Sequence, residues 1–197
     1  ESIPKGLLSL HIMNIKIGSI VIDGNTAQKK ALSPSYNKSL YHKSNIDDIK
    51  KVIIIPCLCH RIHNSYKRVC QHNREMAELI EELHTISKLC IPKRKKLGGL
   101  CPQHVNTRWA NDYDIVKFIL SKKQGIIKYV RKSIDIEKFT NLEKVLRVFK
   151  CLISKFENPK TKFSSTFLTL ERAINCLYEL EDSNDVPFGK ILSVSFS

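Results

Sequence analysis

Residues 52–68 read VIIIPCLCHRIHNSYKR, and the fold prediction starts from this stretch. Four β-branched residues in a row, Val52 to Ile55, show no polar alternation, so both faces of the segment are suited to burial. This pattern is typical of a central strand in a mostly parallel sheet. Pro56 has no backbone N–H to donate and ends the strand. We therefore expect a buried strand that passes directly into a helix.

A second β-rich run precedes it, residues 15–22 (IKIGSIVI), and ends at Asp23-Gly24-Asn25-Thr26. Residues 24–51 separate the two runs, and about a dozen residues are enough for a parallel crossover that includes a helix. We therefore expect a right-handed βαβ unit with Asp23 and Cys57 at the same end of neighbouring strands. A carboxylate before a glycine turn can hold a divalent metal or form an ordinary turn, and the spacing leaves both open.

Thiols and imidazoles crowd the predicted strand–helix junction, which is where ligands collect in open α/β sheets. The possible zinc ligands are Cys57, Cys59, His60, His63, Cys70 and His72. The last two lie about 15 Å farther along a helix, at 1.5 Å per residue, so one ion cannot reach both ends and we expect no structural zinc. Activation of Cys57 as a nucleophile by His60 lacks a third orienting group. Packing and hydrogen bonding are the favoured roles.

The rest of the chain carries helical periodicity. Apolar residues at three- and four-residue steps from Ile62 to Ile86 predict one long helix that reaches about Cys90 and is closed by Pro92. A basic, flexible loop is expected next, with Lys93, Arg94, Lys95 and Lys96 either solvated or in contact with phosphate.

Further helices are expected from Asp112 onward. Thr140 and Glu143 have capping-box spacing, Pro159 breaks a helix, and apolar residues from Phe167 to Tyr178 predict the last one. The expected organisation is a partial core at 1–91, a helical region at 92–182 and a tail at 183–197.

Composition indicates a polyanionic partner. The 197 residues include 33 Lys and Arg against 19 Asp and Glu, a formal net charge of +14. No run of about 18 apolar residues exists, so no membrane span is predicted. The seven cysteines are odd in number and lack the spacing typical of disulfide-bonded secreted domains, which favours a reducing compartment. The start at Glu1 is interpreted as a cut or processed end.

Three stretches, taken in order, resemble hAT-type DNA transposases. IKIGSIVIDGNTAQ (residues 15–28) resembles the strand that carries the second aspartate. CLCHR, with Cys57 and His60 spaced C-x-x-H, resembles the motif after the next strand. TRW, ending at Trp109, resembles the R-W signature inside the helical insertion domain. The resemblance covers roughly residues 7–180.

This resemblance implies an α/β fold, namely a partial RNase-H-like βαβ core followed by an all-α insertion domain. It also implies a nuclear DNA-binding protein, able to form a homo-oligomer, in which an Asp-Asp-Glu triad holds two Mg²⁺ ions for attack on phosphodiesters. Asp23 would be the second carboxylate and metal ligand, with Cys57 and His60 beside the metals. Arg108 and Trp109 would contact DNA, Trp109 by stacking on an unpaired base. A role for Trp109 as a core anchor is equally open.

The chain also departs from the family pattern. Only 22 residues precede Asp23, and no glutamate in the expected serine-rich setting follows the helices. The catalytic triad is therefore interpreted as incomplete, and we expect DNA binding without strand transfer. The alternative is a non-enzymatic basic module that contacts phosphates through Lys93–Lys96, Arg108, Lys122, Lys123 and Lys128.

Overall fold

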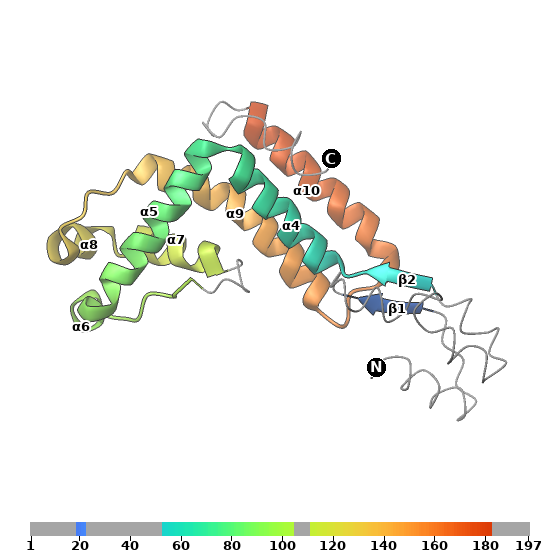
Figure 1. The fold of residues 1–197 in the computed structure, drawn as a ribbon, viewed down its shortest axis with the longest axis horizontal. Coiled ribbons are helices and arrows are strands. Elements are labelled where there is room, and N and C mark those ends of the chain that lie inside the picture. Colours follow the sequence, from blue (N-terminus) through green and yellow to red (C-terminus); the bar gives the residue numbers. More distant parts are fainter. Residues whose placement is uncertain (1–18, 23–52, 105–110, 183–197) are drawn as a thin grey trace, which may run out of the picture. The chain divides into compact units, whose positions relative to one another are not determined.

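The computed structural model describes residues 19–22, 53–104 and 111–182 (Figure 1). The chain divides into two compact units, Glu1–Arg61 and Ile62–Ser197. The division falls earlier than the expected boundary at residue 91, because the residues after Ile62 pack with the helices that follow them. The described part is mostly helical and holds one two-stranded sheet.

The first unit contains the two predicted strands, and they pair in parallel. They are β1 (Ser19–Ile22) and β2 (Ile53–Pro56), with Ile22 opposite Pro56 in register. The Cys57 N–H donates to the Ile22 carbonyl at 2.6 Å, so the ends of both strands lie at one edge. The parallel pairing is confirmed. The expected crossover falls outside the described residues, so the RNase-H-like core stays a prediction.

The expected single long helix is wrong, because the chain forms two helices there. These are α4 (Leu58–His72) and α5 (Arg74–Cys90), and Asn73 separates them with extended backbone angles, φ −115° and ψ 100°. The Asn73 side-chain oxygen accepts a hydrogen bond from the Met76 N–H at 3.0 Å. Asparagine competes with helical backbone bonding in this way, so a continuous apolar stripe did not require a continuous helix.

The expected basic loop is also helical. A short 3-10 turn, η2 (Ile91–Lys93), leads into α6 (Arg94–Leu97). Leu97 is buried and fixes this turn to the protein. Gly98 ends α6 with a left-handed φ of 67°, and its N–H caps the Arg94 and Lys95 carbonyls. The basic residues therefore stand on a fixed helical turn.

Four longer helices complete the described chain: α7 (Asn111–Ser121), α8 (Lys123–Val130), α9 (Ile136–Glu157) and α10 (Thr166–Asp182), with a 3-10 turn η3 (Phe163–Ser165) before the last. The break near Pro159 and the final helix are confirmed. The capping box at Thr140 is wrong, since α9 begins four residues earlier. Asp135 caps it by accepting from the Lys138 N–H at 3.1 Å.

Helices α5, α7 and α9 enclose the core of the second unit, and α10 runs along α9 (Figure 1). The Tyr66 ring of α4 meets Phe149 of α9 edge-on, with ring centres 5.7 Å apart. No helix in the described part of the chain is long and apolar enough to cross a membrane. The largest fully buried side chains are Met76, Leu83, Ile86, Ile115, Ile119, Ile126, Phe139, Leu142, Leu146, Phe149 and Leu177.

Candidate functional site

The residues predicted from sequence fall into three groups. Asp23, Arg108 and Trp109 lie outside the described residues. Cys57 follows β2 and is half-buried, while His60 is exposed in the first turn of α4. Lys93–Lys96 belong to η2 and α6. A further cluster, which no sequence motif indicated, lies inside the helical unit.

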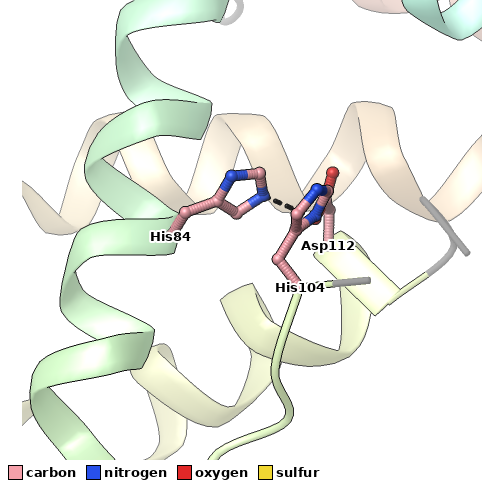
Figure 2. Close-up of side chains that lie close together, drawn as sticks. All are labelled: His84, His104 and Asp112. Atoms are coloured by element: carbon pink, nitrogen blue, oxygen red, sulfur yellow. Dashed lines mark hydrogen bonds and ion pairs between the residues drawn. The ribbon is translucent and has the colours of Figure 1, made fainter. Parts of the chain in front are cut away.

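That cluster consists of three residues (Figure 2). His84 lies on α5, His104 lies in the segment before α7, and Asp112 lies in the first turn of α7. Both imidazoles meet the same carboxylate oxygen. His84 Nε2 lies 2.8 Å from Asp112 Oδ1, and His104 Nδ1 lies 3.1 Å from it. The two rings stack with centres 3.8 Å apart and planes tilted by 31°. For both contacts to be hydrogen bonds, each facing nitrogen must carry the proton, because an ionised carboxylate can only accept.

A fixed segment of chain brings His104 to this position. The Ser87 hydroxyl donates to the Pro102 carbonyl at 2.8 Å, and the Gln103 amide donates to the carbonyls of Ser87 and Cys101 at 3.3 and 3.0 Å. The Asn111 amide donates to the Gln103 carbonyl at 3.3 Å. Since bonds to α5 and α7 hold the segment on both sides, the His104 backbone is placed before any ligand arrives.

The Asp112 carboxylate is almost wholly buried, with 2 % of its side chain exposed. Burial alone would raise its pKa, but the hydrogen bond and electrostatic attraction of His84, with hydrogen bonds from Tyr66 and His104, outweigh burial and hold the pKa below its usual range. The Tyr66 hydroxyl donates to Asp112 Oδ2 at 2.8 Å, which leaves Oδ1 to the imidazoles. Burial in turn raises the pKa of Tyr66 well above its ordinary value, so Tyr66 stays a donor.

The cluster could hold a metal ion, because its three ligand atoms all lie within 4.8 Å of one another. Solvent reaches it, since 19 % of the His84 side chain and 28 % of the His104 side chain are exposed. Sequence reasoning missed it because 28 residues separate His84 from Asp112, and no local spacing marks them as partners. The sequence offered one hint of a polar site, because His84 lies next to the buried apolar residues of α5. The same helix also carries the buried Ser87.

A second feature is a positively charged surface on α6 and α8, called here the α6–α8 basic surface. Its residues are Lys93, Arg94, Lys95, Lys96, Lys122, Lys123 and Lys128. A pocket of about 240 Å³ opens on it, lined by Lys96, Leu97, Ser121, Lys122, Lys123, Gln124 and Gly125. The pocket joins two segments that lie more than twenty residues apart in the sequence.

The charge of this surface is not neutralised locally. Residues 83–111 and 115–134 contain no Asp or Glu. None of the ion pairs found among the described residues includes a member of the α6–α8 basic surface. The ammonium groups of Lys96 and Lys128 instead lie 5.7 and 5.2 Å from the centre of the Tyr129 ring, within cation–π range. The surface therefore presents several cations to solvent in a partly fixed arrangement.

Comparison of this chain with protein-family models, with curated proteins and with solved structures finds no match.

Proposed function

We propose that this chain is related to hAT-type transposases and that its helical unit binds DNA through the α6–α8 basic surface. The observation that supports DNA binding best is the pocket lined by Lys96, Lys122 and Lys123, on a surface whose cations have no acidic partner among the described residues. The relationship to transposases rests on the order of three sequence motifs. The parallel pairing of β1 and β2 is compatible with it, because Asp23 directly follows Ile22, whose carbonyl bonds to Cys57.

Phosphate contact explains this surface better than base recognition. Six of its seven cations are lysines, which are compact point charges without the planar fork of arginine, and this suits contacts that position a phosphate backbone. Each phosphate that is neutralised releases condensed counterions, which makes affinity salt-dependent. The chain's net charge of +14 adds to that attraction. Binding through this surface is therefore sequence-tolerant and electrostatic.

The magnesium chemistry implied by the family is a separate part of the proposal. Mg²⁺ prefers oxygen ligands in octahedral geometry. At the strand–helix junction the described residues offer a thiol from Cys57 and an imidazole from His60, and neither suits that ion. The described residues thus do not by themselves make a magnesium site. Strand transfer is an ancestral activity that we expect this chain to lack.

The test compares two triple variants with equal loss of charge. K96Q/K122Q/K123Q removes the lysines that line the pocket. K155Q/K160Q/K162Q removes three exposed lysines at the end of α9 and just beyond it. Binding of a random-sequence duplex is measured by fluorescence anisotropy from about 50 to 200 mM salt. The pocket variant should lose about 2 to 3 units of the slope of log K against log salt, at roughly 0.9 per phosphate contact.

The control variant should lose less than one such unit. Equal losses in both variants would mean that net charge, and not this surface, attracts DNA. The expected loss of strand transfer is tested separately by incubating the protein with supercoiled DNA and Mg²⁺ or Mn²⁺. Absence of nicking together with intact DNA binding agrees with this expectation, whereas nicking that disappears in an Asp23→Ala variant would show a complete catalytic site and contradict it.

A further inference from the structure

We propose that His84, His104 and Asp112 form a binding site for one divalent transition-metal ion of the zinc class. The proposal does not depend on DNA binding or on the family resemblance. It starts from the convergence of two imidazole nitrogens on one carboxylate oxygen, at 2.8 and 3.1 Å. The three ligands come from α5, from the segment before residue 105 and from α7, so an ion would join three separate parts of the helical unit.

The donor set selects the ion. Imidazole nitrogen suits Zn²⁺, Co²⁺, Ni²⁺ and Cu²⁺, whereas Mg²⁺ and Ca²⁺ prefer all-oxygen sites. Two neutral imidazoles and one carboxylate are typical of zinc sites that keep a fourth position for water. The partial exposure of both histidine side chains gives solvent access to that position. The site thus suits an ion of the zinc class that keeps one exchangeable water as its fourth ligand.

Charge balance supports the same assignment. Asp112 is a buried carboxylate, and its partners in the described part of the chain are the two imidazoles and the Tyr66 hydroxyl. No lysine or arginine among the described residues forms an ion pair with it. A buried charge is costly unless it is paired or coordinates a metal. A divalent ion would add positive charge at the atom where both imidazoles already converge.

Metal binding requires the ligand atoms to rearrange around the ion. Tetrahedral zinc with bonds of about 2.0 to 2.1 Å keeps its ligand atoms about 3.3 Å apart. The distances from His84 Nε2 and His104 Nδ1 to Asp112 Oδ1, 2.8 and 3.1 Å, must therefore lengthen by a few tenths of an ångström. The stacked rings, 3.8 Å apart, must also rotate away from each other. For each imidazole to bind the ion as a neutral ligand, the proton on His84 Nε2 or His104 Nδ1 must move, through solvent, to the other nitrogen of the same ring.

Hydrogen bonds from neighbouring residues already orient the ligand side chains. Tyr66 donates to Asp112 Oδ2 and so leaves Oδ1 as the single coordinating oxygen. Hydrogen bonds from Ser87 and Asn111 hold the segment that carries His104. Loss of such an outer partner lowers metal affinity about 10- to 100-fold in characterised sites. Tyr66→Phe should therefore weaken binding even though it removes no ligand.

The experiment titrates the whole metal-free chain with Co²⁺ and follows its visible absorption, then competes the ion with Zn²⁺. We expect one ion per chain, visible bands of a four-coordinate site and no intense thiolate-to-cobalt band in the near ultraviolet. Asp112→Asn and His104→Gln should each weaken binding about 100-fold or more, with folding checked by circular dichroism. His72→Gln, at the exposed end of α4, is the matched control and should bind as the unaltered protein does.

The seven cysteines make sulfur ligation the main competing outcome. A thiolate band, or loss of binding in a Cys57→Ser/Cys59→Ser variant, would place the metal elsewhere and overturn the proposal. So would the absence of saturable binding below about 100 μM Co²⁺ or Zn²⁺. X-ray absorption of the zinc-loaded unaltered chain gives a result that does not depend on variant folding. Nitrogen and oxygen neighbours alone support the site, and a sulfur shell contradicts it.

Discussion

Tyr66 and Asp112 lie 46 residues apart in the sequence, and the Tyr66 hydroxyl donates a hydrogen bond to Asp112 Oδ2 at 2.8 Å. The bond joins α4 to α7 within the helical unit. The same tyrosine ring packs edge-on against Phe149 of α9. One side chain thus links three helices, with its apolar body in the core and its hydroxyl on the buried carboxylate.

Replacement of Tyr66 by phenylalanine should destabilise the helical unit by about 1–3 kcal/mol, because the buried carboxylate of Asp112 loses a hydrogen-bond donor. The contact with Phe149 survives the substitution, so the loss reports the contacts of the Tyr66 hydroxyl, with Asp112 and with Cys70. Urea denaturation followed by circular dichroism measures it. Tyr178→Phe is the control, since Tyr178 is exposed on α10 and should change stability by less than about 0.5 kcal/mol. An equal loss of stability in Tyr66→Phe and Tyr178→Phe would contradict a stabilising role for the Tyr66 hydroxyl.

Asp112 should make stability depend on pH at the acid end. Its pKa in the folded chain is lower than in the unfolded chain, so the folded state favours the charged form. The resulting stability is present above about pH 4, the ordinary aspartate range, and is lost as the pH falls through the lower folded value. Asp112→Asn should therefore cost about 1–3 kcal/mol at neutral pH and clearly less near pH 2.

Denaturation of both proteins across this pH range measures the difference. Asp114→Asn serves as the control, because Asp114 is partly exposed and forms a surface pair with Lys150. Its effect should be small throughout. A constant stability gap between Asp112→Asn and the unaltered chain down to acid pH would show that the carboxylate charge is not what the hydrogen bonds stabilise.

The cysteine thiols should differ strongly in reactivity. Burial raises the pKa of Cys70 to about 11, whereas Cys151 and Cys176 are exposed on α9 and α10. Only the thiolate attacks, so near pH 8 roughly a thousandth of Cys70 would be reactive. Timed iodoacetamide labelling with peptide mass spectrometry should find Cys151 and Cys176 modified well before Cys70. Comparable rates in the folded chain would contradict the burial of Cys70, and labelling in denaturant provides the reference.

Two helix ends allow a matched backbone comparison. Gly98 after α6 and Arg131 after α8 both adopt left-handed φ, 67° and 57°. Gly98→Ala should destabilise the protein by about 1 kcal/mol, and Arg131→Gly should be neutral or stabilise it, because only glycine adopts this region without strain. Thermal unfolding measures both. An alanine built at Gly98 meets only the Lys122 ammonium at 3.6 Å, so a clash does not complicate the result.

Local features were predictable from the sequence where one physical cause dominated. Uninterrupted β-branched residues ending at Pro56 predicted a buried strand in a parallel pair, and the pairing with β1 is observed. The helix start at Asp135 was missed because Thr140 offered the same capping spacing four residues inside the helix. In the structure the Thr140 hydroxyl donates to the Ile136 carbonyl instead. Sequence spacing identifies possible caps, but packing of the apolar face selects among them.

The His84–His104–Asp112 cluster could not be predicted, for a different reason. Its members are brought together by the packing of α5 against α7 and by bonds from Ser87 and Asn111, and none of these is visible in a local pattern. The stretch around Trp109 is distinctive in composition, but the nearby His104 has no second ligand residue at a recognisable spacing in the sequence. Side-chain sites assembled from distant segments need the tertiary fold before they can be recognised.

The charge distribution around α7 also bears on self-association. Between residues 83 and 134 the only acidic residues are Asp112, which is buried among hydrogen-bond donors, and Asp114, which pairs with Lys150. The α6–α8 basic surface therefore contains no acidic residue of its own. Two such surfaces brought face to face would repel at low salt, since exposed like charges interact over about 10 Å at 0.1 M. A polyanion bound between two copies would offset this repulsion and allow the two basic surfaces to approach each other.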